Sequence, residues 1–232
     1  MITLENISKD FPTTACLHNV NLTVEDGEFL CIMGPSGSGK TTLLNIIGAL
    51  EPPTEGRCII NGTDIYAMTD SARTMYRREH LGFIFQAFNL IDEMTVFENV
   101  ELPLKLKGLP ANERRSRVKD MLARLGISHR AKMYPNELSG GQQQRVAIAR
   151  AVISFYSPAS DSLTNRDTRG KSLILADEPT GNLDSKQGNE VMHLLTELHR
   201  ETGATIVMVT HNHRDADYAD RIVELFDGRV IK

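Results

Sequence analysis

Apolar residues along the chain follow two spacings, and each spacing predicts a different kind of element. Apolar and polar residues alternate over residues 2–7 and 20–24, which predicts strands with one buried face. Other short runs are apolar throughout, which predicts strands buried on both faces of a parallel sheet. These runs cover residues 29–33, 81–85, 173–176 and 205–210.

Helical spacing of apolar residues appears between these strands. A buried helix face directly after the 29–33 strand is predicted by Leu43, Leu44, Ile46, Ile47 and Leu50. The same spacing predicts helices near residues 113–125, 146–153 and 191–198. Asp227-Gly228 lies between two short apolar runs and predicts a two-residue hairpin turn. Strands that alternate with helices indicate an α/β fold.

A glycine-rich loop joins the 29–33 strand to its helix and fits the phosphate-binding pattern G-x-x-x-x-G-K-S/T. Its glycines let backbone N–H groups turn toward an anion at the helix N-terminus, where the helix dipole is positive. A glycine-rich turn without a ligand is the alternative, but the strand before and the helix after favour nucleotide binding. The expected phosphate-binding residues are Gly34, Pro35, Ser36, Gly37, Ser38, Gly39, Lys40 and Thr41.

Polar side chains follow three of the buried strands directly. Gln86 follows the 81–85 run, Asp177 and Glu178 follow the 173–176 run, and His211 follows the 205–210 run. Ligands bind at the carboxyl ends of strands in open α/β sheets, so we expect Asp177 and Glu178 at a ligand site. Asp177 suits Mg²⁺, and Glu178 suits the orientation or deprotonation of water. A lone histidine is more often structural, but the position of His211 favours a role in the site.

A second glycine-rich segment, Leu138-Ser139-Gly140-Gly141-Gln142, precedes a predicted helix. Ser139 and Gln142 have the spacing of a capping box. Two glycines in a first helical turn each cost roughly 1 kcal/mol of helix propensity, which favours a second phosphate contact over an ordinary cap. Phe11 lies in the first turn region, where it either stacks on an adenine ring or packs as an edge aromatic; both readings stay open.

Composition narrows the class of protein. The 232 residues are 41% hydrophobic and 24% charged, as in ordinary globular domains, and the net charge of −4 argues against nucleic-acid binding. No apolar run reaches the roughly 18–20 residues of a membrane helix, and the N-terminus lacks signal-peptide features, so we expect no direct membrane insertion. Cys16, Cys31 and Cys58 form no metal or redox pattern and fit a reducing compartment.

Together these motifs resemble the ATPase subunit of ABC transporters, over essentially the whole chain. The signature segment (residues 138–142) is the most specific feature, in combination with Gln86, Glu178 and His211. The resemblance implies a P-loop NTPase core of the RecA-like kind with an antiparallel β subdomain and an inserted α-helical subdomain. Residues 1–88 and 145–232 would form the catalytic core, and about 89–144 the helical subdomain with the signature segment.

The resemblance also implies roles for single residues, with ATP and Mg²⁺ as cofactors. Lys40 and the phosphate loop, which the resemblance extends to Thr42, bind ATP. Phe11 stacks on its adenine, although tyrosine is commoner there. Thr41, Gln86 and Asp177 serve Mg²⁺. Glu178 is the general base, and His211 contacts the γ-phosphate. Ser139, Gly140, Gly141 and Gln142 bind the ATP of a second subunit, and Asp184 lies in a loop that crosses the dimer interface.

The implied partners are a second ATPase subunit, as a homodimer, and integral membrane permease subunits at the cytoplasmic face of the membrane. Within the family the chain is similar to the lipoprotein-releasing and macrolide-exporter group. Two other functions stay open: regulation of cell-wall or cell-division machinery through a membrane partner, and a soluble ABC ATPase. A simple P-loop kinase would leave the signature segment without a role.

One departure from the family is a long polar connection, residues 152–172, between the signature helix and the strand that ends at Asp177. We expect residues 156–170 to form an inserted surface loop that leaves ATP binding intact, because the connection enters the strand opposite the ligand edge. It is either a partner or regulatory loop, or a tolerated insertion.

Overall fold

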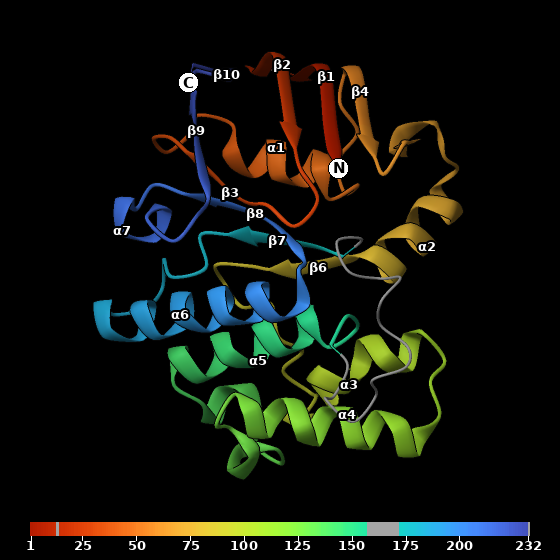
Figure 1. Cartoon of the computed structure of the whole chain (residues 1–232), viewed down its shortest axis with the longest axis vertical. Helices are drawn as coiled ribbons and strands as arrows, with labels where there is room; N and C mark the ends of the chain where they lie inside the picture. Colours follow the sequence, from red (N-terminus) through yellow and green to blue (C-terminus); the bar gives the residue numbers. More distant parts are fainter. Residues whose placement is uncertain (13, 157–171, 232) are drawn as a thin grey trace.

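Two sheets and the helices between and below them form the layers of this computed structural model, which describes residues 1–12, 14–156 and 172–231 (Figure 1). The strands are β1 (Ile2–Phe11), β2 (Thr14–Val24), β3 (Phe29–Met33), β4 (Glu55–Ile60), β5 (Thr63–Asp64), β6 (Leu81–Ile84), β7 (Leu173–Asp177), β8 (Thr205–Thr210), β9 (Arg221–Phe226) and β10 (Arg229–Val230). The helices are α1 (Lys40–Ile47), α2 (Asp70–His80), α3 (Val96–Leu106), α4 (Ala111–Arg124), α5 (Gly140–Val152), α6 (Ser185–Thr202) and α7 (His213–Ala216).

The larger sheet has six strands in the order β10-β9-β3-β8-β7-β6. All neighbours are parallel except β10, which pairs antiparallel with β9 through the predicted turn at Asp227 and Gly228. Both turn residues have positive φ, 44° and 70°, as a two-residue hairpin of this kind requires. Met33 pairs with Thr210, and Asp177 pairs with Val209. The carboxyl ends of β3, β7 and β8 therefore lie at one edge.

The central strands are buried on both faces, as their continuous apolar runs predict. In β3, Phe29, Cys31 and Met33 belong to the core on the side of α5 and α6, whereas Leu30 and Ile32 belong to the core around α1. The side-chain period of two along a strand explains this division. Cores on both faces fix the register of β3, because a slip by one residue would exchange the two sets.

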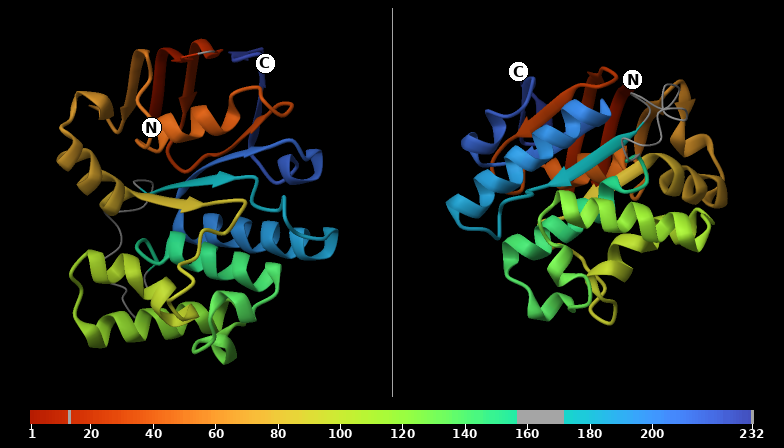
Figure 2. Two further views of the ribbon diagram at one scale, coloured as in Figure 1. Left: turned by 180° about the vertical axis from the view of Figure 1, so that it is seen from behind. Right: turned by 60° about the horizontal axis from the view of Figure 1, so that its bottom comes forward.

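The smaller sheet is antiparallel, in the order β2-β1-β4-β5, and α1 lies between it and the larger sheet (Figures 1 and 2). Leu43, Leu44, Ile46 and Ile47 are buried there, as predicted. The expectation for Leu50 was wrong: α1 ends at Ile47, Ala49 adopts a left-handed φ of 56°, and Leu50 is 47% exposed. The turn after the helix rotates Leu50 off the buried face.

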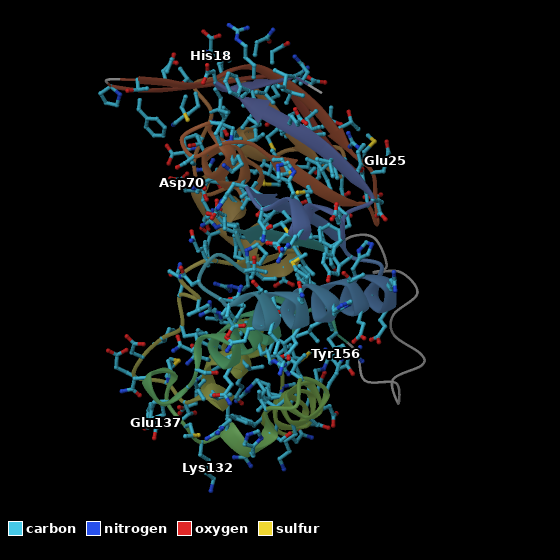
Figure 3. All side chains as sticks on the ribbon, turned by 90° about the vertical axis from the view of Figure 1, so that its left-hand side faces the viewer. His18, Glu25, Asp70, Lys132, Glu137 and Tyr156 are labelled. Carbon is cyan, nitrogen blue, oxygen red and sulfur yellow. The ribbon has the colours of Figure 1, made fainter. Side chains whose placement is uncertain are left out.

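Helices α3 and α4 pack on the side of α5 that faces away from the six-stranded sheet (Figure 1). The proposed subdomain boundary near residue 144 falls within α5, whose apolar side chains join both groups in one core, so the division of the chain stays a prediction. His18 on β2 and Lys132 mark opposite ends of the molecule (Figure 3). Most of the predicted surface loop at 156–170 lies outside the described residues.

Among the helices that the structure describes, none is long and apolar enough to cross a membrane.

The contact between β6 and α5 depends on Gly82. A Cβ atom at this position would lie 2.3 Å from the backbone oxygen of Ala151, which cannot move without displacing the helix. We predict that Gly82→Ala lowers the free energy of unfolding by about 1–3 kcal/mol, the usual cost of overpacking a core, as measured by denaturant titration.

Gly188→Ala is the matched control, because a Cβ atom on this buried residue of α6 would meet its nearest neighbour, Thr180 Cβ, at an ordinary 3.4 Å. We expect that variant to be as stable as the wild type or more so, since alanine favours a helix. Equal stability of the two variants would contradict the steric account of Gly82.

Candidate functional site

A cleft of about 640 Å³ lies at the carboxyl edge of the six-stranded sheet. Three loops that are far apart in the sequence contribute to it, from the ends of β3, β7 and β8, together with Gln86 after β6. The cleft is lined by Cys16, Pro35, Ser36, Gly37, Gly39, Lys40, Thr41, Thr42, Gln86, Asp177, Glu178 and His211. The residues expected from the ends of the buried strands therefore meet in one place.

The phosphate loop (residues 34–41) has the backbone that its glycines allow. Gly39 has a φ of 99°, and a Cβ atom on it would lie 2.9 Å from the backbone oxygen of Cys16. Lys40 begins α1, and its ammonium group donates to the carbonyl oxygens of Gly34 and Pro35, each at 2.8 Å. The buried Ser38 hydroxyl has no hydrogen-bond partner within the described residues. A cationic loop at a helix N-terminus is suited to phosphate.

Asp177 and Thr41 bring two oxygen donors together. The Thr41 hydroxyl donates to Asp177 Oδ1 at 3.2 Å, although the two residues are 136 positions apart in the sequence. Burial raises the pKa of the Asp177 carboxyl, and the charge of Glu178 adds to this, whereas the Thr41 hydroxyl and Lys40 oppose it. The fold therefore keeps a carboxylate where its charge is unfavourable.

Glu178 and His211 form the second polar contact of the cleft. His211 Nδ1 lies 2.8 Å from Glu178 Oε1, so the ring donates to the carboxylate when that nitrogen carries the proton. Glu178 has a φ of 43°, a left-handed conformation that L-residues rarely adopt, and its N–H donates to the oxygen of Val209 at 2.9 Å. The unusual backbone turns its side chain toward the histidine at the end of the neighbouring strand.

Gln86 lies next to two concave regions of the surface. Its side chain lines the cleft, and its backbone oxygen accepts from Asn182 Nδ2 at 2.8 Å. The preceding residue, Phe85, lines a separate, mostly apolar groove of about 510 Å³ between α2, β6, α3 and α5. Gln86, which lines the cleft, is therefore the direct neighbour in sequence of a residue that lines the groove.

The signature segment lies apart from this cleft. Its capping box is confirmed: the Ser139 hydroxyl accepts from the N–H of Gln142, and Gln142 Oε1 accepts from the N–H of Ser139 at 3.1 Å. Ser139, Gly141 and Gln142 line another hollow, of about 280 Å³, together with Gln187 and Glu190, and Gly140 packs against Leu183. Asp184 caps α6 by accepting from the N–H of Gln187 at 2.8 Å.

Phe11 is also outside the lining of the cleft. It is 40% exposed, and the ammonium group of Lys9 lies 5.1 Å from the centre of its ring. Cys16, which the sequence did not single out, does line the cleft, and its thiol lies 3.3 Å from the Thr42 hydroxyl. No local pattern marks Cys16, because its position depends on how β2 packs beside the phosphate loop.

Comparison with known proteins places the chain in a family. Residues 17–156 match the family described as ABC transporter. The ABC transporter ATP-binding protein YtrE of Bacillus subtilis is 49% identical over 212 residues, which are 91% of this chain and 85% of that protein. The macrolide export ATP-binding/permease protein MacB of Bartonella henselae is 45% identical over the full chain, which spans only 33% of its length.

Solved structures are similar to this chain in both fold and sequence. The dimeric structure of MJ0796, described as a bacterial ABC transporter cassette, matches with a TM-score of 0.86 and 44% identity, over 100% of this chain and 97% of that one. A second structure of that cassette, with the same similarity, is a post-hydrolysis state bound to ADP and Pi. With the phosphate loop, the acidic edge of β7 and the signature segment all present, the chain belongs to the ABC transporter family, whose cassettes bind and hydrolyse ATP.

Proposed function

We propose that the chain is the ATP-binding and ATP-hydrolysing subunit of an ABC transporter, and that it drives a conformational change in membrane subunits. One observation carries this proposal: the phosphate loop, Asp177, Glu178, His211 and Gln86 line one cleft, whereas the signature segment faces elsewhere. A complete site therefore takes two chains. Export, lipoprotein release and mechanical transmission across a membrane are all compatible with such a motor.

The phosphate loop is the proposed binding site for the phosphates of ATP. The cleft is large enough for a nucleotide, and the N-terminus of α1 supplies N–H groups and a positive dipole end. Lys40 lines the cleft and is placed to reach the outer phosphates. Phe11 remains the proposed adenine contact from the resemblance, and Cys16 is a nearer candidate lining residue.

Thr41, Asp177 and Gln86 are the proposed residues for Mg²⁺. They offer oxygen donors, which Mg²⁺ prefers, on one side of the cleft. Among the described residues there is no cluster of three or more His, Cys, Asp or Glu side chains that would hold a metal ion alone, so phosphate oxygens would complete the coordination. Bound Mg²⁺ would neutralise charge on the phosphates during transfer.

Glu178 is the proposed general base. Its carboxylate would accept the proton of the attacking water, as a new bond forms to the γ-phosphorus and the bond to the ADP oxygen breaks. His211, within hydrogen-bond distance of Glu178, would contact the γ-phosphate and keep the carboxylate oriented. The catalytic effect comes mainly from positioning and electrostatics.

The proposed assembly is a head-to-tail homodimer, in which Ser139, Gly140, Gly141 and Gln142 of one chain complete the ATP site of the other. Separation of these residues from the cleft of their own chain supports this arrangement. Asp184, at the start of α6, would lie in the loop that crosses between the two chains.

A membrane permease is the proposed second partner, which would hold the chain at the cytoplasmic face of the membrane. MacB carries ATP-binding and permease functions in one protein, and this chain matches a third of its length. The groove beside Phe85 is the proposed docking site for an apolar helix of the permease, because Leu106, Pro103 and Ile91 line it next to Gln86.

The first prediction from the proposed function concerns the cost of the Asp177 charge in the nucleotide-free protein. Because burial raises the pKa of Asp177, Asp177→Asn should raise the free energy of unfolding at neutral pH while it weakens Mg·ATP binding. As the pH falls through the raised pKa, wild-type Asp177 takes up its proton and the difference between the two proteins should shrink.

Denaturant titrations over a pH series measure this effect. Asp92→Asn, at an exposed position before α3, is the matched control and should show no comparable gain at neutral pH. An Asp177→Asn variant that is no more stable than the wild type at neutral pH would argue against an unfavourable buried charge.

The second prediction tests the base. Glu178→Gln keeps the shape of the side chain but cannot accept the proton, so kcat for ATP should fall by about 100-fold or more, within the usual range for loss of general base catalysis. ATP binding should persist, and the variant should dimerise with ATP in size-exclusion chromatography. Glu224→Gln, at an exposed position of β9, is the matched control. Normal turnover by Glu178→Gln would show that the base assignment is wrong.

The third prediction tests the groove. Leu106 is 52% exposed and lines it, whereas Leu50 is similarly exposed, at 47%, and is not among its lining residues. Leu106→Glu should lower the amount of membrane protein that co-purifies with the chain in detergent, because a charge in an apolar contact opposes burial. Leu50→Glu should not. Equal recovery with both variants would exclude the groove as the docking site.

A further inference from the structure

A buried polar pair lies behind the cleft and is not part of its lining. Thr180 follows Glu178 by two residues, and Asp215 lies on α7, four residues after His211. The Thr180 hydroxyl donates to Asp215 Oδ2. Thr180 is 8% exposed and Asp215 is 4% exposed, so water does not compete for this hydrogen bond.

The pair is next to the most strained backbone of the site. Glu178 has a left-handed φ of 43°, a conformation that is unfavourable for a residue with a Cβ atom. The N–H of Gly181 donates to the oxygen of Glu178 at 3.0 Å, which closes a tight turn around Pro179 and Thr180. Such a conformation persists only where surrounding contacts hold it, so the contacts of this turn decide how Glu178 is presented.

Two buried side chains from different helices hold this turn. Gln144 on α5 donates to the oxygen of Pro179 at 2.5 Å and is fully buried. Asp215 binds the next residue, Thr180, from α7. Besides the backbone bond from the N–H of Glu178 to the oxygen of Val209, two side-chain contacts join the segments that carry Glu178 and His211. Glu178 and His211 themselves form one in the cleft, and Thr180 and Asp215 form the other in the interior.

We propose that Asp215 is a positioning residue for ATP hydrolysis: through the hydroxyl of Thr180 it fixes the backbone that presents Glu178 to His211. This inference rests on the proposed role of Glu178 as the base. Asp215 touches neither the nucleotide cleft nor the reacting atoms. Its effect is therefore expected on turnover and not on ATP binding.

Stability alone does not explain an aspartate at this position. Burial raises the pKa of Asp215, and the nearby charge of Glu178 adds to this, while the side chains of Thr180, Asn212 and His211 oppose it. Replacement of both partners of a buried hydrogen bond by apolar groups of similar shape is often neutral or stabilising. Stability alone therefore gives no reason for an aspartate here, and its proposed role is to fix the geometry of the turn.

The test compares Thr180→Val, Asp215→Leu and the double variant in the full chain. Each single change removes one partner of the buried hydrogen bond and should lower both the melting temperature and kcat. The double variant should recover most of the melting temperature, because neither member of the pair is then buried without the other. Its kcat for Mg·ATP should still be about 10- to 100-fold below wild type, as expected for a small misplacement of a catalytic group, with KM and ATP affinity nearly unchanged.

Two further variants serve as controls. Thr180→Ser keeps the hydroxyl and should restore kcat to nearly the wild-type value. Thr205→Val is the matched control: Thr205 is also buried, and its hydroxyl accepts from the N–H of Gly27 at 2.9 Å, but it lies at the opposite end of β8 from His211. It should lower the melting temperature and leave kcat as it is.

A double variant with recovered stability and wild-type kcat would overturn the proposal, since the pair would then be only structural. A loss of ATP affinity equal to the loss of turnover would also overturn it. Glu178→Gln, measured in parallel, separates this failure from that of the proposed function. Normal turnover by Glu178→Gln contradicts the base, whereas an inactive Glu178→Gln beside a fully active double variant contradicts only the role of Asp215.

Discussion

The site depends on the parallel register of β3, β8, β7 and β6. Met33 pairs with Thr210, Asp177 with Val209, and Ile84 with Ala176, so these strands end at the same edge of the sheet. The phosphate loop, the acidic pair and His211 come from positions more than 30 residues apart, and only this register brings them together. Apolar cores on both faces of the sheet make a slip of register costly, and they thereby protect the geometry of the cleft.

Three energetically unfavourable features lie at the carboxyl edge of the sheet, and buried contacts in the interior stabilise this region. Asp177 keeps its charge where burial opposes it, Glu178 has a left-handed backbone, and Lys40 is largely buried. An isolated segment of the chain would not keep any of these three features. The buried contacts of Gln144 and the Asp215–Thr180 pair surround the turn after β7, so the fold uses interior polar groups to maintain a strained surface.

The sequence predicts what has a local pattern. Apolar runs mark the central strands, the glycine-rich loop marks the start of α1, and Ser139 with Gln142 marks the start of α5. No local pattern predicts the strand order, because β3 pairs with β8 and β9, which lie far from it in the sequence. Leu50 shows the limit of periodicity: it continues the helical pattern, but the chain turns at Ala49. Cys16 and Asp215 gain their neighbours only through tertiary packing, and no spacing points to them.

Helix α5 is the element that connects the separate parts of the molecule (Figure 1). At its start, Ser139 and Gln142 form the signature cap. In its middle, Gln144 holds the turn after Glu178, and near its end the guanidinium group of Arg150 donates to the oxygens of Phe88 and Asn89 at 3.0 and 2.6 Å. Phe88 and Asn89 both have left-handed φ, so Arg150 holds a strained segment directly after Gln86. A helix is stiff over this length, and a displacement of the signature cap would therefore reach the base and the groove together.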